Sequence, residues 1–300
     1  MKVMVFDVGG TEIKYSVMDE GLNRTDAGSV PTPQDTQEHF LDTLYALYSP
    51  HRDEVSGIAM ALPGFVDTRT GFVSNGGALL YNTGTQVGQL VRERCGCPVT
   101  LENDGKAAAL AELQAGALQG CCNAAVFIIG TGVGGGIIAN GQLVRGVHFT
   151  AGEYSFVNTN ADEWENTEKT MACQCSTKYL LKWYRARKGL PADAPMNGKL
   201  FFDAANAGEP EALEVLERFC KMVAVQIYNL TVLLDVEKVA IGGGISAAEA
   251  LLPAIQAELD WLFERCTVMP AVKPELVRCR YGNNANLIGA LKLFFEQNPA

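Results

Sequence analysis

The sequence predicts an α/β protein built from two related lobes. Strand and helix patterns alternate along the 300 residues, and 48% of the residues are hydrophobic, enough for a compact core. A strand, a glycine-rich turn, a second strand and a polar turn occur at residues 3–23 and again at residues 124–143. Because the second copy falls near the middle of the chain, we expect an internal duplication, with each lobe opening on a β-meander.

The expected strands are short apolar runs or alternations bounded by turn residues. The alternation is clearest at Ile13, Tyr15 and Val17, and Asn140-Gly141 is typical of a tight hairpin turn. We expect strands at residues 3–6, 13–17, 56–62, 98–101, 124–129, 137–139, 238–241 and 275–280.

The expected helices carry apolar residues three and four positions apart. Phe40, Leu41 and Leu44 show this spacing, and Asp104 stands where an N-cap belongs, ahead of an alanine-rich run. We expect a loop at residues 191–198. The expected helices are residues 36–48, 86–95, 107–117, 167–188, 209–234, 247–263 and 286–297.

Composition excludes several classes of protein. The formal net charge of −10 disfavours nucleic acid as a partner, because phosphate backbones attract basic surfaces. Asp7 interrupts the apolar start of the chain, so we expect neither a signal peptide nor a membrane partner. The nine cysteines are odd in number and fit free thiols, so we expect a cytoplasmic protein.

The first glycine-rich turn combines groups that suit a phosphate or a metal ion. Asp7 ends a strand and can hold a metal ion directly or through water. Gly9 and Gly10 let the backbone approach an anion, and the Thr11 hydroxyl can donate to a phosphate oxygen. Lys14 follows in the next strand. A plain β-hairpin is the alternative interpretation.

A second glycine-rich turn spans residues 130–136 and contains the spacing of a dinucleotide-binding motif. That motif requires a helix directly after the glycines, whereas a strand pattern follows here, so we exclude it. Two glycine turns, one in each lobe, predict a phosphate clamp, with two hairpins as the alternative. The turn at residues 242–244 offers a third place where a nucleotide can approach the backbone. A simple strand-to-helix turn is the alternative interpretation.

Three acidic or amide side chains stand together at Glu102, Asn103 and Asp104. A carboxylate at such a strand-to-helix junction can accept a proton from a substrate hydroxyl, but an N-cap role for Asp104 is the commoner use. Glu153 can present a carboxylate to hydroxyl groups or lie on the surface. Cys173-x-Cys175 and Cys95-x-Cys97 have thiolate-ligand spacing, yet neither has a third ligand in register, which favours free thiols.

Taken in order, these motifs resemble the ROK family of sugar kinases over essentially the whole chain. The resemblance implies two duplicated actin-like (ribonuclease H-like) lobes with a central cleft, residues 1–117 plus 286–300 and residues 118–285. The motifs that carry the resemblance are Asp7-x-Gly9-Gly10-Thr11, Pro63-Gly64, Glu102-Asn103-Asp104, Gly130-Thr131-Gly132-x-Gly134-Gly135-Gly136, Ala151-Gly152-Glu153 and Gly242-Gly243-Gly244.

The resemblance also implies roles for these residues in an ATP- and Mg²⁺-dependent hexose kinase that acts as a homodimer. Asp104 becomes the general base for the sugar 6-hydroxyl, with Mg²⁺ held at Asp7. Gly64, Asn75, Asn103 and Glu153 become sugar contacts. The phosphate and nucleotide contacts become Asp7, Gly9, Gly10, Thr11, Lys14, Thr131, Gly132 and Gly243.

This sequence departs from the family pattern at two places. Ser155 and Phe156 stand where typical members have Gly-His, whose histidine binds zinc and sugar. Cys173 and Cys175 remain from the family's zinc loop, but its third cysteine and its glutamate are missing, so we expect no zinc. The exchange of an imidazole for an apolar ring favours a substituted hexose, a β-glucoside or an N-acylated sugar, alongside glucose itself.

Other functions compete with that of a kinase. A catalytically weak sugar sensor with the same fold is the main alternative, although such a protein needs no base at Asp104. The Glu102-Asn103-Asp104 and Ala151-Gly152-Glu153 pair disfavours an acetate- or glycerol-type kinase. Because the first phosphate turn begins at residue 7, we expect no DNA-binding segment of the kind that the family's repressors carry.

Overall fold

The computed structural model describes residues 1–266 and 272–299, which form two compact units. Residues 267–271 and 300 fall inside the predicted lobes and lie outside the described residues. The predicted lobe boundaries stay a prediction, and by their contacts residues 145–151 group with unit 1. Unit 1 comprises Met1–Gln114, Arg145–Ala151 and Asn284–Ala300, and unit 2 comprises Ala115–Val144 and Gly152–Asn283.

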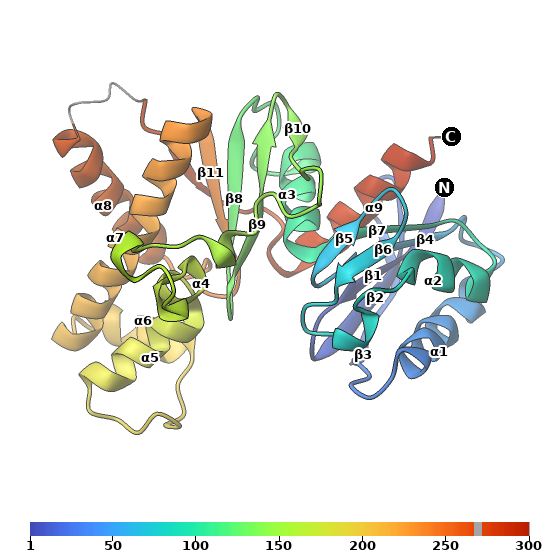
Figure 1. Ribbon diagram of the computed structural model, residues 1–300, viewed down its shortest axis with the longest axis horizontal. Coiled ribbons are helices and arrows are strands. Elements are labelled where there is room, and N and C mark those ends of the chain that lie inside the picture. Colours follow the sequence, from blue (N-terminus) through green and yellow to red (C-terminus); the bar gives the residue numbers. More distant parts are fainter. Residues whose placement is uncertain (267–271, 300) are drawn as a thin grey trace. The chain divides into compact units, whose positions relative to one another are not determined.

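Each unit contains a five-stranded sheet, and the two sheets have the same topology (Figure 1). The strands of the first are β1 (Lys2–Val8), β2 (Glu12–Asp19), β3 (Arg24–Pro31), β4 (Ile58–Leu62) and β7 (Val99–Asn103), in the order β3-β2-β1-β4-β7. Those of the second are β8 (Ala124–Ile129), β9 (Val133–Ala139), β10 (Gln142–Leu143), β11 (Lys238–Gly242) and β12 (Glu275–Arg278), in the order β10-β9-β8-β11-β12.

The pairing within the sheets confirms the predicted duplication and the α/β, actin-like fold class. β1 pairs antiparallel with β2 and parallel with β4, and β8 pairs in the same two ways with β9 and β11. A small hairpin of β5 (Phe65–Asp67) and β6 (Phe72–Asn75) follows β4. The sequence did not predict β3, because its residues are largely polar and exposed and give no apolar alternation.

Parallel strands place their carboxyl ends at one edge of each sheet. In unit 1, Asp7 pairs with Ala61 and Leu62 pairs with Asn103, so β1, β4 and β7 end together. In unit 2, Ile128 pairs with Gly242 in the same way. Ligand sites of open α/β sheets form at this edge, and the predicted site residues of each unit follow these strand ends.

The core of unit 1 lies between its sheet and its helices. Met4, Phe6 and Val8 pack with Phe40 and Leu44 in one apolar cluster, and Thr36 caps the first helix by accepting from the backbone N–H of His39. The helices are α1 (Gln37–Tyr48), α2 (Val87–Cys95), α3 (Asp104–Ala115) and α9 (Ala285–Gln297), of which α9 contacts β1, β4 and β7.

Helices α9 and α3 approach each other backbone to backbone. A Cβ atom built at Gly289 of α9 would lie 1.7 Å from the carbonyl oxygen of Ala107 in α3. Only glycine permits that approach, because no side chain fits between the two helices. The helix that begins at Asp104 is therefore held in place by α9.

Unit 2 contains a predicted helix that the structure divides. Residues 167–188 do not form one helix, and that prediction was wrong: Thr170 has extended backbone and Cys175 leaves the helical region. The backbone N–H of Thr177 instead donates to the carbonyl of Gly130, which fixes a new helix start. The helices are α4 (Met171–Gln174), α5 (Thr177–Arg187), α6 (Gly198–Asn206), α7 (Pro210–Leu234) and α8 (Leu251–Arg265).

The sequence predicted the loop at residues 191–198 but not helix α6, which follows it. Asn197, near the end of that loop, caps the helix by accepting from the N–H of Leu200. In Figure 1 the long helix α7 lies beside α8 and the sheet of unit 2. None of the helices within the described residues combines the length and the apolar character needed to cross a bilayer.

Candidate functional site

The junction of β7 and α3 carries the predicted base. The Asn103 Oδ1 atom accepts from the backbone N–H of Lys106 at 3.0 Å, so Asn103 supplies the cap of α3. The N-cap interpretation of Asp104 was therefore wrong, and Asp104 is the first residue of the helix. Its Oδ1 atom accepts from the Gly105 N–H at 2.8 Å and from the Asn103 Nδ2 at 3.0 Å.

Asn103 also links this junction to the turn after β4. Its Nδ2 donates to the carbonyl of Gly64 at 2.9 Å. Gly64 has a φ of +96°, and a Cβ there would lie 2.0 Å from the carbonyl oxygen of Asn75, so the position requires glycine. The structure thus brings together four predicted sugar-site residues of unit 1, namely Gly64, Asn75, Asn103 and Asp104.

Glu102 lies buried directly before this junction. Its Oε1 atom accepts from the Asn103 N–H at 3.0 Å, and its Oε2 atom accepts from the Arg145 Nε at 2.7 Å. Burial raises the pKa of Glu102, while the Arg145 guanidinium opposes that rise. Sequence reasoning missed Arg145, although it is the only Lys or Arg between Lys106 and Lys169.

The first glycine turn places its carboxylate as predicted, at the end of β1. Asp7 lies opposite Lys14 on β2, with 3.9 Å between its Oδ2 atom and the Lys14 Nζ. Asn286 of α9 donates to the Asp7 Oδ1 at 2.9 Å. Burial raises the pKa of Asp7, against the opposing effects of Asn286 and Lys14.

The glycines of this turn are fixed by polar side chains of the following segment. Thr32 donates to the carbonyl of Gly9, and Gln34 donates to the carbonyl of Gly10, each at 2.7 Å. A Cβ at Gly10 would lie 2.9 Å from the Cβ of Ala78, which leaves no space for a larger residue. Thr11 is exposed. One corner of unit 1 therefore contains all five residues predicted around the first turn, namely Asp7, Gly9, Gly10, Thr11 and Lys14.

The second glycine turn belongs to unit 2. The Gly130 N–H donates to the Gly132 carbonyl at 3.0 Å, which closes the turn, and Thr131 at its tip is exposed. Ser155 supports it, because its hydroxyl contacts both the N–H and the carbonyl of Val133 at 3.1 Å. One of the two residues that replace the family's Gly-His pair thus holds the predicted phosphate turn.

Gly243 lies beside the strand that leads into this turn. Its φ is +91°, and a Cβ there would lie 2.2 Å from the carbonyl oxygen of Ile129, the last residue of β8. A cavity of about 280 Å³ adjoins the next residue, Gly244. The cavity is lined by residues of α6 and of the segment after β11: Gly198, Lys199, Phe202, Asp203, Asn206, Gly244, Ile245, Ala247 and Ala248.

Glu153 precedes a single 3₁₀ turn of unit 2, Tyr154–Phe156, and Phe156 is the last residue of that turn. The Phe156 N–H donates to the carbonyl of Glu153 at 3.2 Å. Glu153 is partly buried, whereas the Phe156 side chain is 69% exposed. A large apolar ring with that exposure contributes little to the core of its unit.

Cys173 and Cys175 are free cysteines, one partly buried and the other buried. Burial raises the pKa of the Cys175 thiol, and Cys173 hydrogen-bonds Tyr179, which raises the pKa of that phenol to about 12. Within residues 1–266 and 272–299, the one cluster of three potential metal ligands does not include either cysteine.

We expect the purified protein to contain much less than one zinc ion per chain. Two cysteines offer half of the four ligands that a structural zinc site needs. Elemental analysis by plasma mass spectrometry measures this directly, on protein dialysed without chelator. A stoichiometric zinc ion would contradict the assignment of Cys173 and Cys175 as free thiols.

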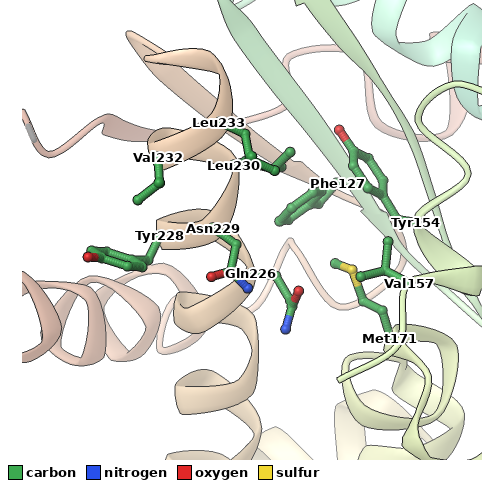
Figure 2. A pocket seen from close by; sticks show the side chains of 10 residues that line it. All are labelled: Phe127, Tyr154, Val157, Met171, Gln226, Tyr228, Asn229, Leu230, Val232 and Leu233. Atoms are coloured by element: carbon green, nitrogen blue, oxygen red, sulfur yellow. The ribbon is translucent and has the colours of Figure 1, made fainter. Parts of the chain in front are cut away.

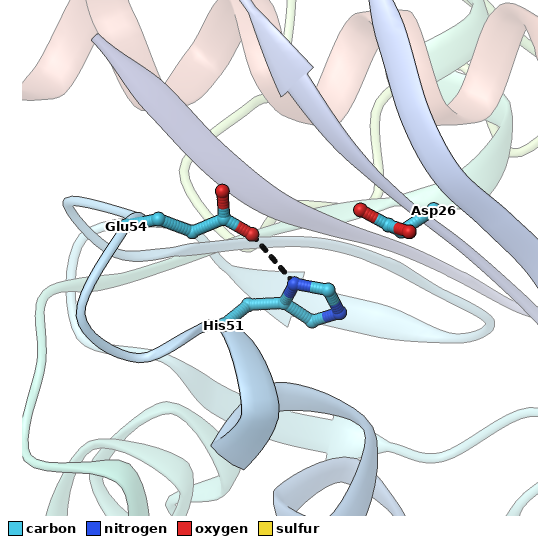
Figure 3. A group of neighbouring side chains, drawn as sticks. All are labelled: Asp26, His51 and Glu54. Carbon is cyan, nitrogen blue, oxygen red and sulfur yellow. Dashed lines mark hydrogen bonds and ion pairs between the residues drawn. The ribbon is translucent and has the colours of Figure 1, made fainter.

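The three-ligand cluster consists of Asp26, His51 and Glu54 in unit 1. Figure 3 shows His51 directed at Glu54, with 2.6 Å between its Nδ1 and the Glu54 Oε1. Lys2 also pairs with Glu54 at 3.2 Å. Lys2 and His51 thus already contact the Glu54 carboxylate, and no predicted site residue belongs to the cluster.

Unit 2 also has an apolar cavity of about 420 Å³. Figure 2 shows that side chains from the second half of α7 line one side, and that Phe127, Tyr154, Val157 and Met171 line the other. None of the lining residues was predicted as a site residue.

The chain is similar to known proteins over nearly its whole length. The ROK family model matches residues 3–297. A β-glucoside kinase of Klebsiella pneumoniae is 29% identical over 98% of this chain and 96% of its own length. An N-acetyl-D-glucosamine kinase of Vibrio atlanticus is 29% identical over 95% of this chain and 97% of its own.

A solved structure supports the same relationship. The ROK family glucokinase of Streptomyces griseus, in complex with glucose and AMPPNP, superposes with a TM-score of 0.82 at 25% identity, covering 98% of this chain and 99% of that one.

Proposed function

The chain belongs to the ROK family and is a sugar kinase, and from that premise we propose that it transfers the γ-phosphate of ATP to the 6-hydroxyl of a hexose. One observation carries the proposal. The Asp104 carboxylate stands at the first position of α3 without serving as its cap, and it is oriented by hydrogen bonds from Asn103 and Gly105. A protein that only binds sugar needs no carboxylate held in this way.

In the proposed reaction Asp104 accepts the proton of the attacking hydroxyl. General base catalysis of this kind contributes roughly 100- to 10,000-fold to a rate. Asn103 orients the Asp104 carboxylate, and its side-chain amide lies beside Gly64. The other proposed sugar ligands are Asn75 and Glu153. Phosphoryl transfer depends mainly on positioning and on charge stabilisation, so oriented backbone and side-chain donors suffice for the rest.

The nucleotide is proposed to bind through both glycine turns. Backbone N–H groups of glycine turns suit phosphate oxygens, and the side chains of Thr11, Lys14 and Thr131 add donors. For the adenosine group we propose the cavity that adjoins Gly244 after β11 and is lined partly by Lys199 and Asp203. The AMPPNP complex of the Streptomyces griseus glucokinase supports ATP as the donor.

The donor set at the first turn fits Mg²⁺. Asp7 provides a buried carboxylate at a strand end, and magnesium sites in kinases commonly combine one or two carboxylates with water and substrate phosphates. When bound there, the ion would neutralise charge on the phosphate oxygens. Asn286 and Lys14 orient and compensate the Asp7 carboxylate from the protein side.

For the sugar we propose glucose or a substituted hexose, with β-glucosides and N-acylated hexoses ahead of glucose. The curated relatives support this choice, since they are named β-glucoside kinase and N-acetyl-D-glucosamine kinase. Phe156 supports it as well, because an exposed ring in place of the family's histidine favours an apolar substituent. A weak sugar sensor remains the alternative.

An ADP-release assay tests the proposal. The protein is incubated with Mg-ATP and a panel of free, N-acetylated and β-linked hexoses. We expect turnover on one of these classes, and its identity assigns the substrate. If no sugar of the panel causes ADP release but calorimetry detects sugar binding, the result would favour the catalytically weak sugar sensor.

We further propose that the kinase is a cytoplasmic homodimer in which two copies meet at the apolar surface around the cavity of Figure 2. Leu233 is 77% exposed there, and Val157 and Val232 are 42% and 41% exposed. Burying apolar side chains of this size stabilises association.

Light scattering of the wild-type protein should give twice the chain mass, and Leu233→Glu should give a monomer. A monomeric wild-type protein at micromolar concentration would contradict this proposal.

A further inference from the structure

Arg145 begins a short segment that belongs to unit 1 although its neighbours in the sequence do not. Residues 145–151 group with unit 1, whereas Val144 and Gly152 on either side belong to unit 2. The Arg145 Nε donates to the Glu102 Oε2 at 2.7 Å, and the Glu102 side chain is completely buried. An arginine distant in sequence thus reaches the residue that precedes the proposed site.

The bonds continue from Arg145 to the proposed base. Glu102 accepts from Arg145 with one oxygen and from the Asn103 N–H with the other. The Asn103 side chain then donates to the Asp104 carboxylate. Arg145, Glu102, Asn103 and Asp104 form one continuous chain of hydrogen bonds, so the orientation of the last carboxylate depends on the first guanidinium.

The charge of Glu102 depends on this partner. Burial disfavours the carboxylate anion and raises the pKa of Glu102, and the cations that oppose this effect are Arg145 and Lys106. Removing one member of a buried ion pair leaves an uncompensated charge, which then takes up or loses a proton. Without Arg145, we expect Glu102 to keep its proton to a higher pH than in the wild type.

An unsatisfied donor of Arg145 indicates that this residue does more than stabilise the fold. Its Nη2 atom is buried and has no hydrogen-bond acceptor among the described residues. An unsatisfied buried donor destabilises a fold, so a side chain selected only for stability would avoid it. The guanidinium contributes its charge and its Nε bond to Glu102.

We propose that Arg145 is a positioning residue for phosphoryl transfer: it holds Glu102 as an anion, which fixes the Asn103 backbone and thereby aims the Asp104 carboxylate. This inference rests on the proposed function, because it concerns the same base. Arg145 acts through Glu102 and does not itself need to touch the substrate.

The test compares Arg145→Met with the wild type on the sugar found to turn over. We expect kcat to fall about 30- to 100-fold, since a displacement of about 1 Å at a reacting group can cost that much. The KM for ATP should stay within about threefold, because the glycine turns are unaltered.

The pH profile separates positioning from general loss of structure. In Arg145→Met the pKa of Glu102 rises further, so the anion is lost at a higher pH. The acidic limb of the kcat profile should therefore move upward by about one pH unit or more. Arg145→Lys keeps the charge and should restore the limb. Adding Glu102→Gln to Arg145→Met removes the group whose titration moves the limb, so the limb should return to its wild-type position, while kcat stays low because the anion that fixes Asn103 is absent.

Arg69→Met is the matched control. The Arg69 guanidinium lies 4.8 Å from the centre of the Phe149 ring, so it is a second arginine that contacts residues 145–151, but it does not contact Glu102. We expect its kcat within twofold of wild type and an unmoved limb. An Arg69→Met effect equal to that of Arg145→Met would overturn the inference in favour of simple anchoring of the segment.

A second readout does not depend on turnover. A carboxyl group whose pKa is higher in the folded state binds extra protons there, so its contribution makes the free energy of unfolding fall as pH rises. The contribution of Glu102 to this fall should be larger in Arg145→Met than in wild type, so the slope steepens, and it should be absent in the double variant.

The two proposals fail separately. A wild-type protein without turnover on any sugar contradicts the kinase proposal. Turnover in wild type with an unchanged kcat or acidic limb in Arg145→Met contradicts the positioning role. An unchanged stability slope in Arg145→Met contradicts the coupling of Arg145 to Glu102 whether or not the protein turns over.

Discussion

Asp104→Asn is expected to lower kcat by about 1,000-fold while sugar binding stays within about tenfold. The amide has the shape of the carboxylate and can still accept from Gly105 and Asn103, but it cannot take the proton of the attacking hydroxyl. ADP release measures kcat, and calorimetry measures the sugar dissociation constant. The separation of the two effects distinguishes a base from a binding residue.

Asp42→Asn is the control for this substitution. Asp42 lies on α1 of the same unit, is exposed and pairs with Arg94, away from the proposed site. Its kcat should remain within twofold of wild type. If Asp104→Asn retained more than a tenth of the wild-type kcat, the general-base role would be wrong.

Gly289→Ala should have the largest effect on stability. A Cβ at this position would lie 1.7 Å from the carbonyl oxygen of Ala107, so α9 and α3 must separate to accept one methyl group. We expect the free energy of unfolding to fall by about 3 kcal/mol or more. Since Asp104 begins α3 and Asn286 of α9 orients Asp7, kcat should fall as well. Urea denaturation followed by circular dichroism measures the loss.

Gly244→Ala is the matched control for stability. A Cβ at Gly244 meets no atom within 4 Å, and its φ lies outside the left-handed region. Its free energy of unfolding should change by less than about 1 kcal/mol. Equal stability of the two variants would show that the contact between α9 and α3 can relax without cost.

The sequence predicted the strands and glycine turns well because their signals are local. Ile13, Tyr15 and Val17 alternate with polar residues, and the glycines at residues 9–10 and 130–136 mark tight turns directly. The repeated meander, with the family resemblance, then predicted the duplicated fold. Two sheets with the same strand order confirm it.

The details of the site were less accessible because single tertiary contacts decide them. Asn103 and Asp104 are both good caps, and the hydrogen bond from the Lys106 N–H selects the first of them. The bond from Thr177 to Gly130 divides a helix that the apolar spacing predicts as continuous. Arg145 follows β8 and β9 in the sequence, and its hydrogen bond to Glu102 joins residues 43 positions apart. No local sequence pattern reveals such a contact.

The central claim is that this chain phosphorylates the 6-hydroxyl of a hexose with ATP. The most direct measurement is ³¹P–¹H correlation NMR on the product formed from Mg-ATP and the sugar that turns over, with its 6-deoxy analogue in parallel. We expect a phosphorus resonance coupled to the protons on C6, and no product from the analogue. Phosphate on another hydroxyl, or ADP formed without any sugar phosphate, would contradict the claim.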